Sequence, residues 1–155
     1  MGFMKESFAS KVLKISLYVI FALGVVGTAS LHFMLDYYMM LFYDAYSLYP
    51  QYRTFLFIFM TSAAIPGLWV VWEMILMMRS IPLGPFIIRN VHALRRIGVI
   101  MFVVSAMFFA KLFLYFTFLT MAFGVLLLIL AFFAFTLSNL FRQAVLYKEE
   151  NDLTI

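Results

Sequence analysis

The chain has 155 residues, of which 66% are hydrophobic and only 12% are charged. A soluble domain carries about 25% charged residues, and one of this size could not bury so much apolar surface. The composition therefore excludes a soluble globular protein and predicts a chain folded in lipid. The absence of cysteine excludes disulfides, thiolate metal sites and cysteine nucleophiles, and the net charge of +4 matters chiefly through where its charges lie.

Long apolar stretches predict an all-α membrane protein, a single domain over residues 1–155 that forms a bundle of four transmembrane helices. A bilayer core is crossed by about 20 helical residues, and in hydrocarbon a helix satisfies its own backbone groups. The apolar run 98–141 is long enough for two crossings, with a turn near 111–120. The predicted helices cover about residues 15–35, 54–78, 98–115 and 119–141.

The first apolar stretch also resembles a cleaved signal peptide, because lysines precede it and small residues follow at 27–29. The stretch continues to Leu35, however, and the apolar core of a signal peptide is shorter. We therefore expect a retained membrane helix.

Nine of the eleven Lys and Arg residues fall before the first helix, between the second and third, or after the fourth. Basic residues accumulate in cytoplasmic loops. This asymmetry predicts a multi-pass protein of the cytoplasmic membrane with the N- and C-termini in the cytoplasm.

The segment between the second and third helices begins with the Pro- and Gly-containing turn 81–85, followed by an amphipathic helical pattern. One face of the pattern carries Phe86, Asn90, Leu94 and Ile97, and another carries Arg89, His92 and Arg96. We predict a cytoplasmic interfacial helix between helices 2 and 3. It could bind anionic lipid headgroups or dock a cytoplasmic protein.

Glu73 is the only acidic residue inside a predicted span, so it is a candidate for proton or cation transport. It lies close to the inner boundary, where an ion pair with an arginine such as Arg79, Arg95, Arg96 or Arg142 is the favoured interpretation. Lys111 lies about 20 Å from that side along its helix. We expect its side chain to extend to the outer headgroups.

His32 and Asp36 share a helix face at spacing i, i+4 near the outer side, which makes them candidates for binding an outer-face ligand. Two ligands do not complete a metal site, and the position of Asp44 is open, so we predict no metal and no cofactor. The Tyr-rich segment 36–53 is either an interfacial helix or a lid over a pocket. The charged tail 147–155 is either a frayed end or a peptide that packs on the cytoplasmic face or on a partner.

Two motifs resemble bacterial membrane proteins of the domain-of-unknown-function family 2975. They are Pro85-Phe86…Asn90…Leu94-Arg95-Arg96-Ile97-Gly98 and the ending Glu149-Glu150-Asn151-Asp152-Leu153-Thr154-Ile155. The resemblance implies a four-helix protein of the bacterial cytoplasmic membrane, often encoded beside a small helix-turn-helix regulator of the Cro type. It also implies that Asn90 and the acidic tail are contact positions, and it carries no catalytic residue.

The leading hypothesis is therefore a non-enzymatic regulatory or sensory protein that binds a cytoplasmic protein, such as a helix-turn-helix transcriptional regulator, and does not itself bind nucleic acid. The predicted partner-binding residues are Arg89, Asn90, Arg95, Arg96, Asn151, Asp152, Leu153, Thr154 and Ile155. Alternatives are a small proton- or ion-coupled transporter that uses Glu73, and an immunity protein against a membrane-active peptide. No catalytic motif is present in the sequence. A bundle this small can also form a homodimer.

Overall fold

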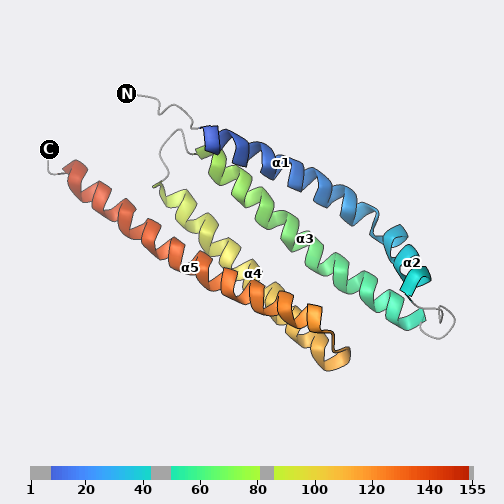
Figure 1. Ribbon diagram of the computed structural model, residues 1–155. Coiled ribbons are helices and arrows are strands. Elements are labelled where there is room, and N and C mark those ends of the chain that lie inside the picture. Colours follow the sequence, from blue (N-terminus) through green and yellow to red (C-terminus); the bar gives the residue numbers. More distant parts are fainter. Residues whose placement is uncertain (1–7, 43–49, 81–85, 154–155) are drawn as a thin grey trace.

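The computed structural model describes residues 8–42, 50–80 and 86–153 (Figure 1). Over these ranges the chain is all-helical, as predicted, and contains no strand. The helices are α1 (Phe8–Ala29), α2 (Leu31–Phe42), α3 (Pro50–Ser80), α4 (Ile88–Leu114) and α5 (Phe118–Leu153). The predicted turn 81–85, Asp44, Thr154 and Ile155 lie outside the described residues.

Four of these helices are long and apolar enough to cross a bilayer, covering Phe8–Ala29, Gln51–Ser80, Ile88–Leu114 and Phe118–Asn151. Only 6% to 28% of their most apolar windows is buried inside the protein. Most of the apolar side chains therefore face outward, as expected where lipid is the solvent. Length, composition and outward-facing apolar surface together indicate a multi-pass membrane protein.

The helices form two hairpin-like layers, α1 with α3 and α4 with α5, joined by contacts between α3 and α4 (Figure 1). The start of α1, the end of α3, the start of α4 and the end of α5 lie at one end of the bundle, here called the basic end. The opposite end contains α2, the start of α3 and the turn between α4 and α5, and is called the aromatic end.

The first predicted span, 15–35, differs from the structure: it is divided between α1 and α2 by a bend at Ser30 (Figure 1). The hydroxyl of Thr28 donates to the carbonyl of Gly24 at 2.7 Å, and that of Ser30 donates to the carbonyl of Gly27 at 3.3 Å. Such bonds from side chain to backbone commonly bend helices. The bend turns α2, with His32, toward the start of α3.

The segment 88–97 does not form a separate interfacial helix, because it is continuous with α4. Its amphipathic pattern is confirmed in part: Asn90, Leu94 and Ile97 are buried and Arg89 and His92 are exposed, but Phe86, which was predicted on the same face as Asn90, is 44% exposed. The buried face packs against α3 and α5, and this packing extends α4 in one piece beyond the predicted span.

Helices α4 and α5 approach closely at Gly98. A Cβ at this position would lie 2.8 Å from the ring of Phe135 and 3.2 Å from the carbonyl oxygen of Ala131. Beside this contact, Val70, Ile97 and Ala134 form a small buried core. A residue without a side chain is thus favoured at this close approach of α4 and α5.

The charged tail is helical through Leu153 and is not a frayed end. Helix α5 continues without interruption through Leu153, and its side chains from Leu146 to Asn151 are exposed. Residues 146–153 are called the α5 extension. It projects past the start of α4 at the basic end (Figure 1).

Candidate functional site

The predicted ion pair of Glu73 is present, and its partner is Arg96. The guanidinium donates from Nε to one carboxylate oxygen at 2.8 Å and from Nη2 to the other at 3.0 Å. Glu73 is buried, whereas the side chain of Arg96 is 52% exposed. This two-pronged contact ties α3 to α4, and charge-assisted pairs of this geometry are among the stronger hydrogen bonds in proteins.

Asn90 is held inside the bundle at the start of α4. It is 3% exposed, and its side-chain oxygen accepts a hydrogen bond from the hydroxyl of Ser80 at 3.0 Å. The contact joins the end of α3 to the start of α4 on either side of their connection. Asn90 was expected at a partner-binding surface, but its burial gives it a structural position instead.

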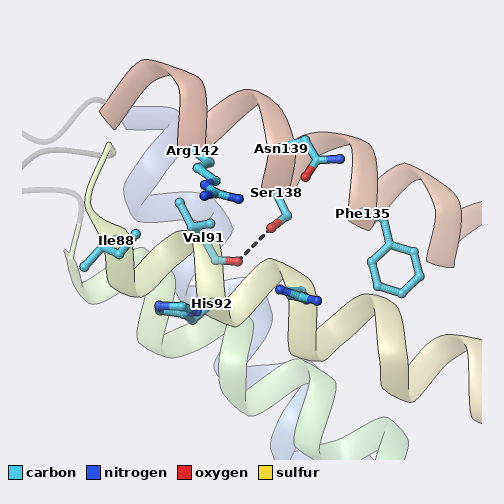
Figure 2. Close-up of a pocket in the computed structure, with 8 residues that line it drawn as sticks. Ile88, Val91, His92, Phe135, Ser138, Asn139 and Arg142 are labelled. Atoms are coloured by element: carbon cyan, nitrogen blue, oxygen red, sulfur yellow. Dashed lines mark hydrogen bonds between the residues drawn. The ribbon is translucent and has the colours of Figure 1, made fainter. Parts of the chain in front are cut away.

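A cavity of about 650 Å³ opens between α4 and α5 at the basic end (Figure 2). Its floor includes a bond between the helices, in which the hydroxyl of Ser138 donates to the carbonyl of Val91 at 2.9 Å. Figure 2 shows α4 on one side of the cavity and α5 on the other. The cavity is lined by Ile88, Val91, His92, Arg95, Phe135, Ser138, Asn139 and Arg142.

The lining of the cavity includes two arginines, an imidazole and an amide beside apolar side chains. Arg95 and Arg142 supply fixed positive charge, and Asn139 supplies an additional donor and acceptor. This set can bind an acidic group, from a lipid headgroup or from an acidic side chain of a protein. Arg95 also borders a second cavity of about 400 Å³ beside Trp69 and Arg96.

The sequence reasoning did not assign His92, Asn139 and Arg142 to one site, although a signal was available. The lining residues of α4 and those of α5 both follow the spacing i, i+3, i+4, i+7. That spacing places four residues on one helix face. Two such faces, each with polar members at the end of an apolar run, predict a shared polar surface between neighbouring helices.

The tail residues predicted to bind a partner lie away from this cavity, on the α5 extension. Asn151 is exposed on the helix, and Asp152 and Leu153 complete it. Arg89 is exposed on the first turn of α4. The predicted set is therefore spread along the basic end, with Asn90 inside it and Arg96 engaged by Glu73.

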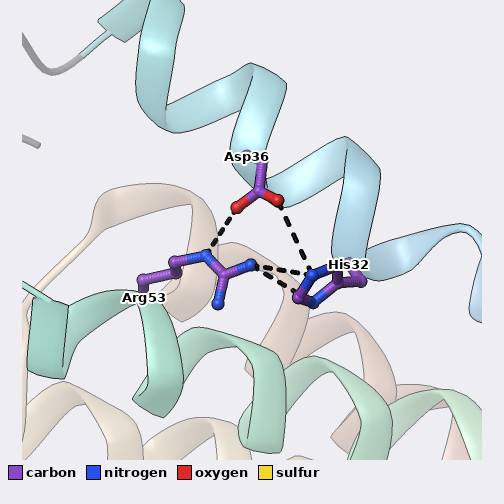
Figure 3. A network of polar contacts seen from close by, with 3 residues as sticks. All are labelled: His32, Asp36 and Arg53. Carbon is purple, nitrogen blue, oxygen red and sulfur yellow. Dashed lines mark hydrogen bonds and ion pairs between the residues drawn. The ribbon is translucent and has the colours of Figure 1, made fainter.

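At the aromatic end His32 and Asp36 lie on one face of α2, as predicted, but Arg53 of α3 joins them (Figure 3). The guanidinium donates from Nε to the carboxylate of Asp36 at 2.6 Å, and its Nη2 lies 3.2 Å from Nδ1 of His32. Within the described residues no three His, Cys, Asp or Glu side chains form a cluster suited to a metal. The group is an ion-pair network that fastens α2 to α3.

The expectation that Lys111 extends to the outer headgroups is wrong. Lys111 is only 7% exposed, and its ammonium donates to the hydroxyl of Thr120 at 3.0 Å. It also lies 5.1 Å from the centre of the Phe59 ring. The side chain points into the bundle because the last turn of α4 faces both α3 and the start of α5, a rotation that charge spacing alone does not reveal.

A family model, described as a protein of unknown function (DUF2975), matches residues 40–155. The chain belongs to this family. The matched part contains the second, third and fourth apolar spans, the cavity at the basic end and the α5 extension, so the motifs that carried the resemblance lie inside it. No curated protein matches this DUF2975 chain, and no solved structure does.

Proposed function

We propose that this DUF2975 protein is a non-enzymatic protein of the bacterial cytoplasmic membrane that binds a cytoplasmic protein at its basic end, such as a helix-turn-helix transcriptional regulator. The observation that carries this proposal is the α5 extension. Residues 146–153 continue α5 by about 12 Å at 1.5 Å per residue, as a helix whose described side chains are exposed to solvent.

Charge distribution supports a cytoplasmic position for the basic end. Eight of the Lys and Arg residues that the structure describes belong to this end: Lys11, Lys14, Arg79, Arg89, Arg95, Arg96, Arg142 and Lys148. Basic residues flank membrane spans on the cytoplasmic side. A partner of the α5 extension would then be a cytoplasmic protein.

The extension has the chemistry of a protein-binding helix. Leu146 and Tyr147 are 49% and 71% exposed and offer apolar contact area. Glu149 and Glu150 follow them and add negative charge. A helix-turn-helix protein has a basic face that binds DNA phosphates, so an acidic helix can bind that face and compete with DNA.

The geometry favours this function over a proton-coupled exporter. The carboxylate of Glu73, which the exporter would use, is occupied by both prongs of the Arg96 guanidinium. The ion pair is therefore better explained as a structural link between α3 and α4.

The test is capture of partners from bacterial membranes in mild detergent, using the full chain and a chain that ends at Lys148. A matched control carries Phe113→Ala, which changes a side chain that is 92% exposed at the aromatic end. We expect the full chain and the control to retain a helix-turn-helix protein that the shortened chain loses. Equal recovery by all three chains would contradict the proposal.

A second measurement tests the competition directly. The captured regulator is bound to its DNA, and the membrane protein is added in lipid nanodiscs. We expect the full chain to release the DNA and a Glu149→Lys/Glu150→Lys variant to fail, because reversed charge repels a basic face. Release by both would show that the acidic residues are not the contact.

A further inference from the structure

The aromatic end contains a cavity in which Lys111 is the charged residue among the described lining residues. Its volume is about 390 Å³, within the range of about 300–1,000 Å³ typical of small-molecule sites. The cavity lies among α2, α3, α4 and α5, and most of its wall is apolar. The apolar part includes Leu35, Leu56, Phe59, Ala63, Phe108 and Phe123.

Among the residues that the structure describes, none balances the charge of Lys111. Its contacts are the hydroxyl of Thr120 and the face of Phe59, both of which are neutral. Among the described residues no carboxylate forms an ion pair with it, whereas Glu73 and Asp36 are each paired with an arginine. Burying an ammonium without a counter-ion is costly, so this wall is suited to an anion.

The start of α5 adds to the same wall. Thr117, Leu119 and Thr120 line the cavity, and they belong to the turn before α5 and to its first turn. The first N–H groups of a helix have no acceptor within the helix, and the N-terminal end carries partial positive charge. The buried ammonium, the hydroxyl of Thr120 and the beginning of a 36-residue helix therefore converge on one side of an apolar cavity.

We propose that this cavity binds an amphiphile with an acidic headgroup and one apolar chain, with Lys111 and the first turn of α5 holding the headgroup and the apolar wall holding the chain. The headgroup can be the carboxylate of a fatty acid or the phosphate of a single-chain lipid, since both offer oxygen acceptors to an ammonium. The site is at the opposite end of the bundle from the α5 extension, and the proposal does not depend on partner binding there.

The proposal is tested with the full chain in nanodiscs of uncharged phosphatidylcholine. Binding of dodecanoate, dodecyl phosphate and dodecanol is measured by native mass spectrometry and by titration calorimetry. We expect both acids to bind at least about tenfold more tightly than the alcohol, because one charge-assisted hydrogen bond changes a dissociation constant by about that factor. The tighter of the two acids identifies the headgroup.

Two variants examine the two parts of the site. Lys111→Met keeps an apolar stem of similar length and should weaken the binding of both acids about tenfold. Lys11→Met is the control, because it changes an exposed lysine of α1, and it should leave the binding of both acids unchanged. Ala63→Leu occupies part of the apolar side of the cavity and leaves Lys111 in place, and it should also weaken the binding of both acids. It keeps the test decisive if Lys111→Met does not fold.

Equal binding of dodecanol and dodecanoate to the unmodified chain would overturn the proposal, because the headgroup would then contribute nothing. Unchanged binding of both acids to folded Lys111→Met or Ala63→Leu protein would overturn it as well, because the acids would then be held elsewhere.

Discussion

The two ends of the bundle differ in what surrounds a buried charged side chain. At the basic end Glu73 is buried and meets Arg96 in a bidentate pair. At the aromatic end Lys111 is buried to a similar degree, and within the described part of the chain its side chain contacts a hydroxyl and an aromatic ring face. A charge that is balanced within the chain links helices, whereas one that is unbalanced and borders a cavity indicates a ligand.

The largest effect is expected at Glu73. Glu73→Gln keeps the shape of the side chain but removes its charge. It should therefore lower the unfolding free energy by about 2 kcal/mol, because two charged hydrogen bonds are lost. Unfolding in mixed detergent micelles measures the change, and a double-mutant cycle with Arg96→Gln isolates the pair. Additive single effects would show that the pair does not couple α3 to α4.

The next effect concerns Gly98, which brings α4 close to α5 and so positions both ends. Gly98→Ala places a Cβ against Phe135 and should lower the unfolding free energy by about 1–2 kcal/mol through overpacking. Gly27→Ala is the matched control, because a Cβ there meets no atom within 4 Å. The control should leave stability unchanged or raise it by about 0.5 kcal/mol. A loss of stability at both positions would contradict the prediction, because it would show that alanine destabilises either helix without a close contact.

A smaller effect is expected for the hydrogen bond between Ser80 and Asn90. Ser80→Ala should cost about 1 kcal/mol, because it removes the hydroxyl that donates to Asn90 of α4 as well as to the carbonyl of Met77 in its own helix. Ser62→Ala serves as its control, since that hydroxyl donates only to the carbonyl of Phe59 in its own helix. Thermal unfolding of the two variants should rank Ser80→Ala as the less stable, and the reverse order would contradict a structural role for the bond.

The smallest effect is expected in the network of His32, Asp36 and Arg53. Its side chains are partly exposed to solvent, which screens their interaction. Arg53→Gln should change the unfolding free energy by about 0.5 kcal/mol, and the difference should shrink as salt is added. A loss that is large and independent of salt would mean that α2 depends on a buried ion pair here.

Much of the fold could be predicted from hydropathy, because a bilayer imposes long apolar helices and little else. The amphipathic start of α4 was also predictable, since Asn90, Leu94 and Ile97 recur at helical spacing. The bend at Ser30 was not, because it depends on hydrogen bonds from side chain to backbone that compete with a straight helix. The length of α5 exceeded its apolar run because helical backbone continues into water where no residue stops it.

The sites were harder to predict than the spans. The partner of Glu73 was within the proposed set, because few arginines lie at the right depth. The inward direction of Lys111 was missed, since the rotation of a helix that is apolar on all sides leaves no periodic signal. The cavity at the basic end combines residues 47 positions apart in the sequence, and only the pairing of α4 with α5 reveals it.

The contrast between the two buried charges is tested most directly by comparing Glu73→Gln with Lys111→Met in the same uncharged micelles. We predict that Glu73→Gln lowers the unfolding free energy, whereas Lys111→Met leaves it unchanged or raises it, because an unbalanced buried charge is replaced by an apolar side chain. Added dodecanoate should then stabilise the unmodified protein but not Lys111→Met. An equal loss of stability in both variants, with no effect of dodecanoate, would show that Lys111 is a structural link like Glu73 and would contradict this account.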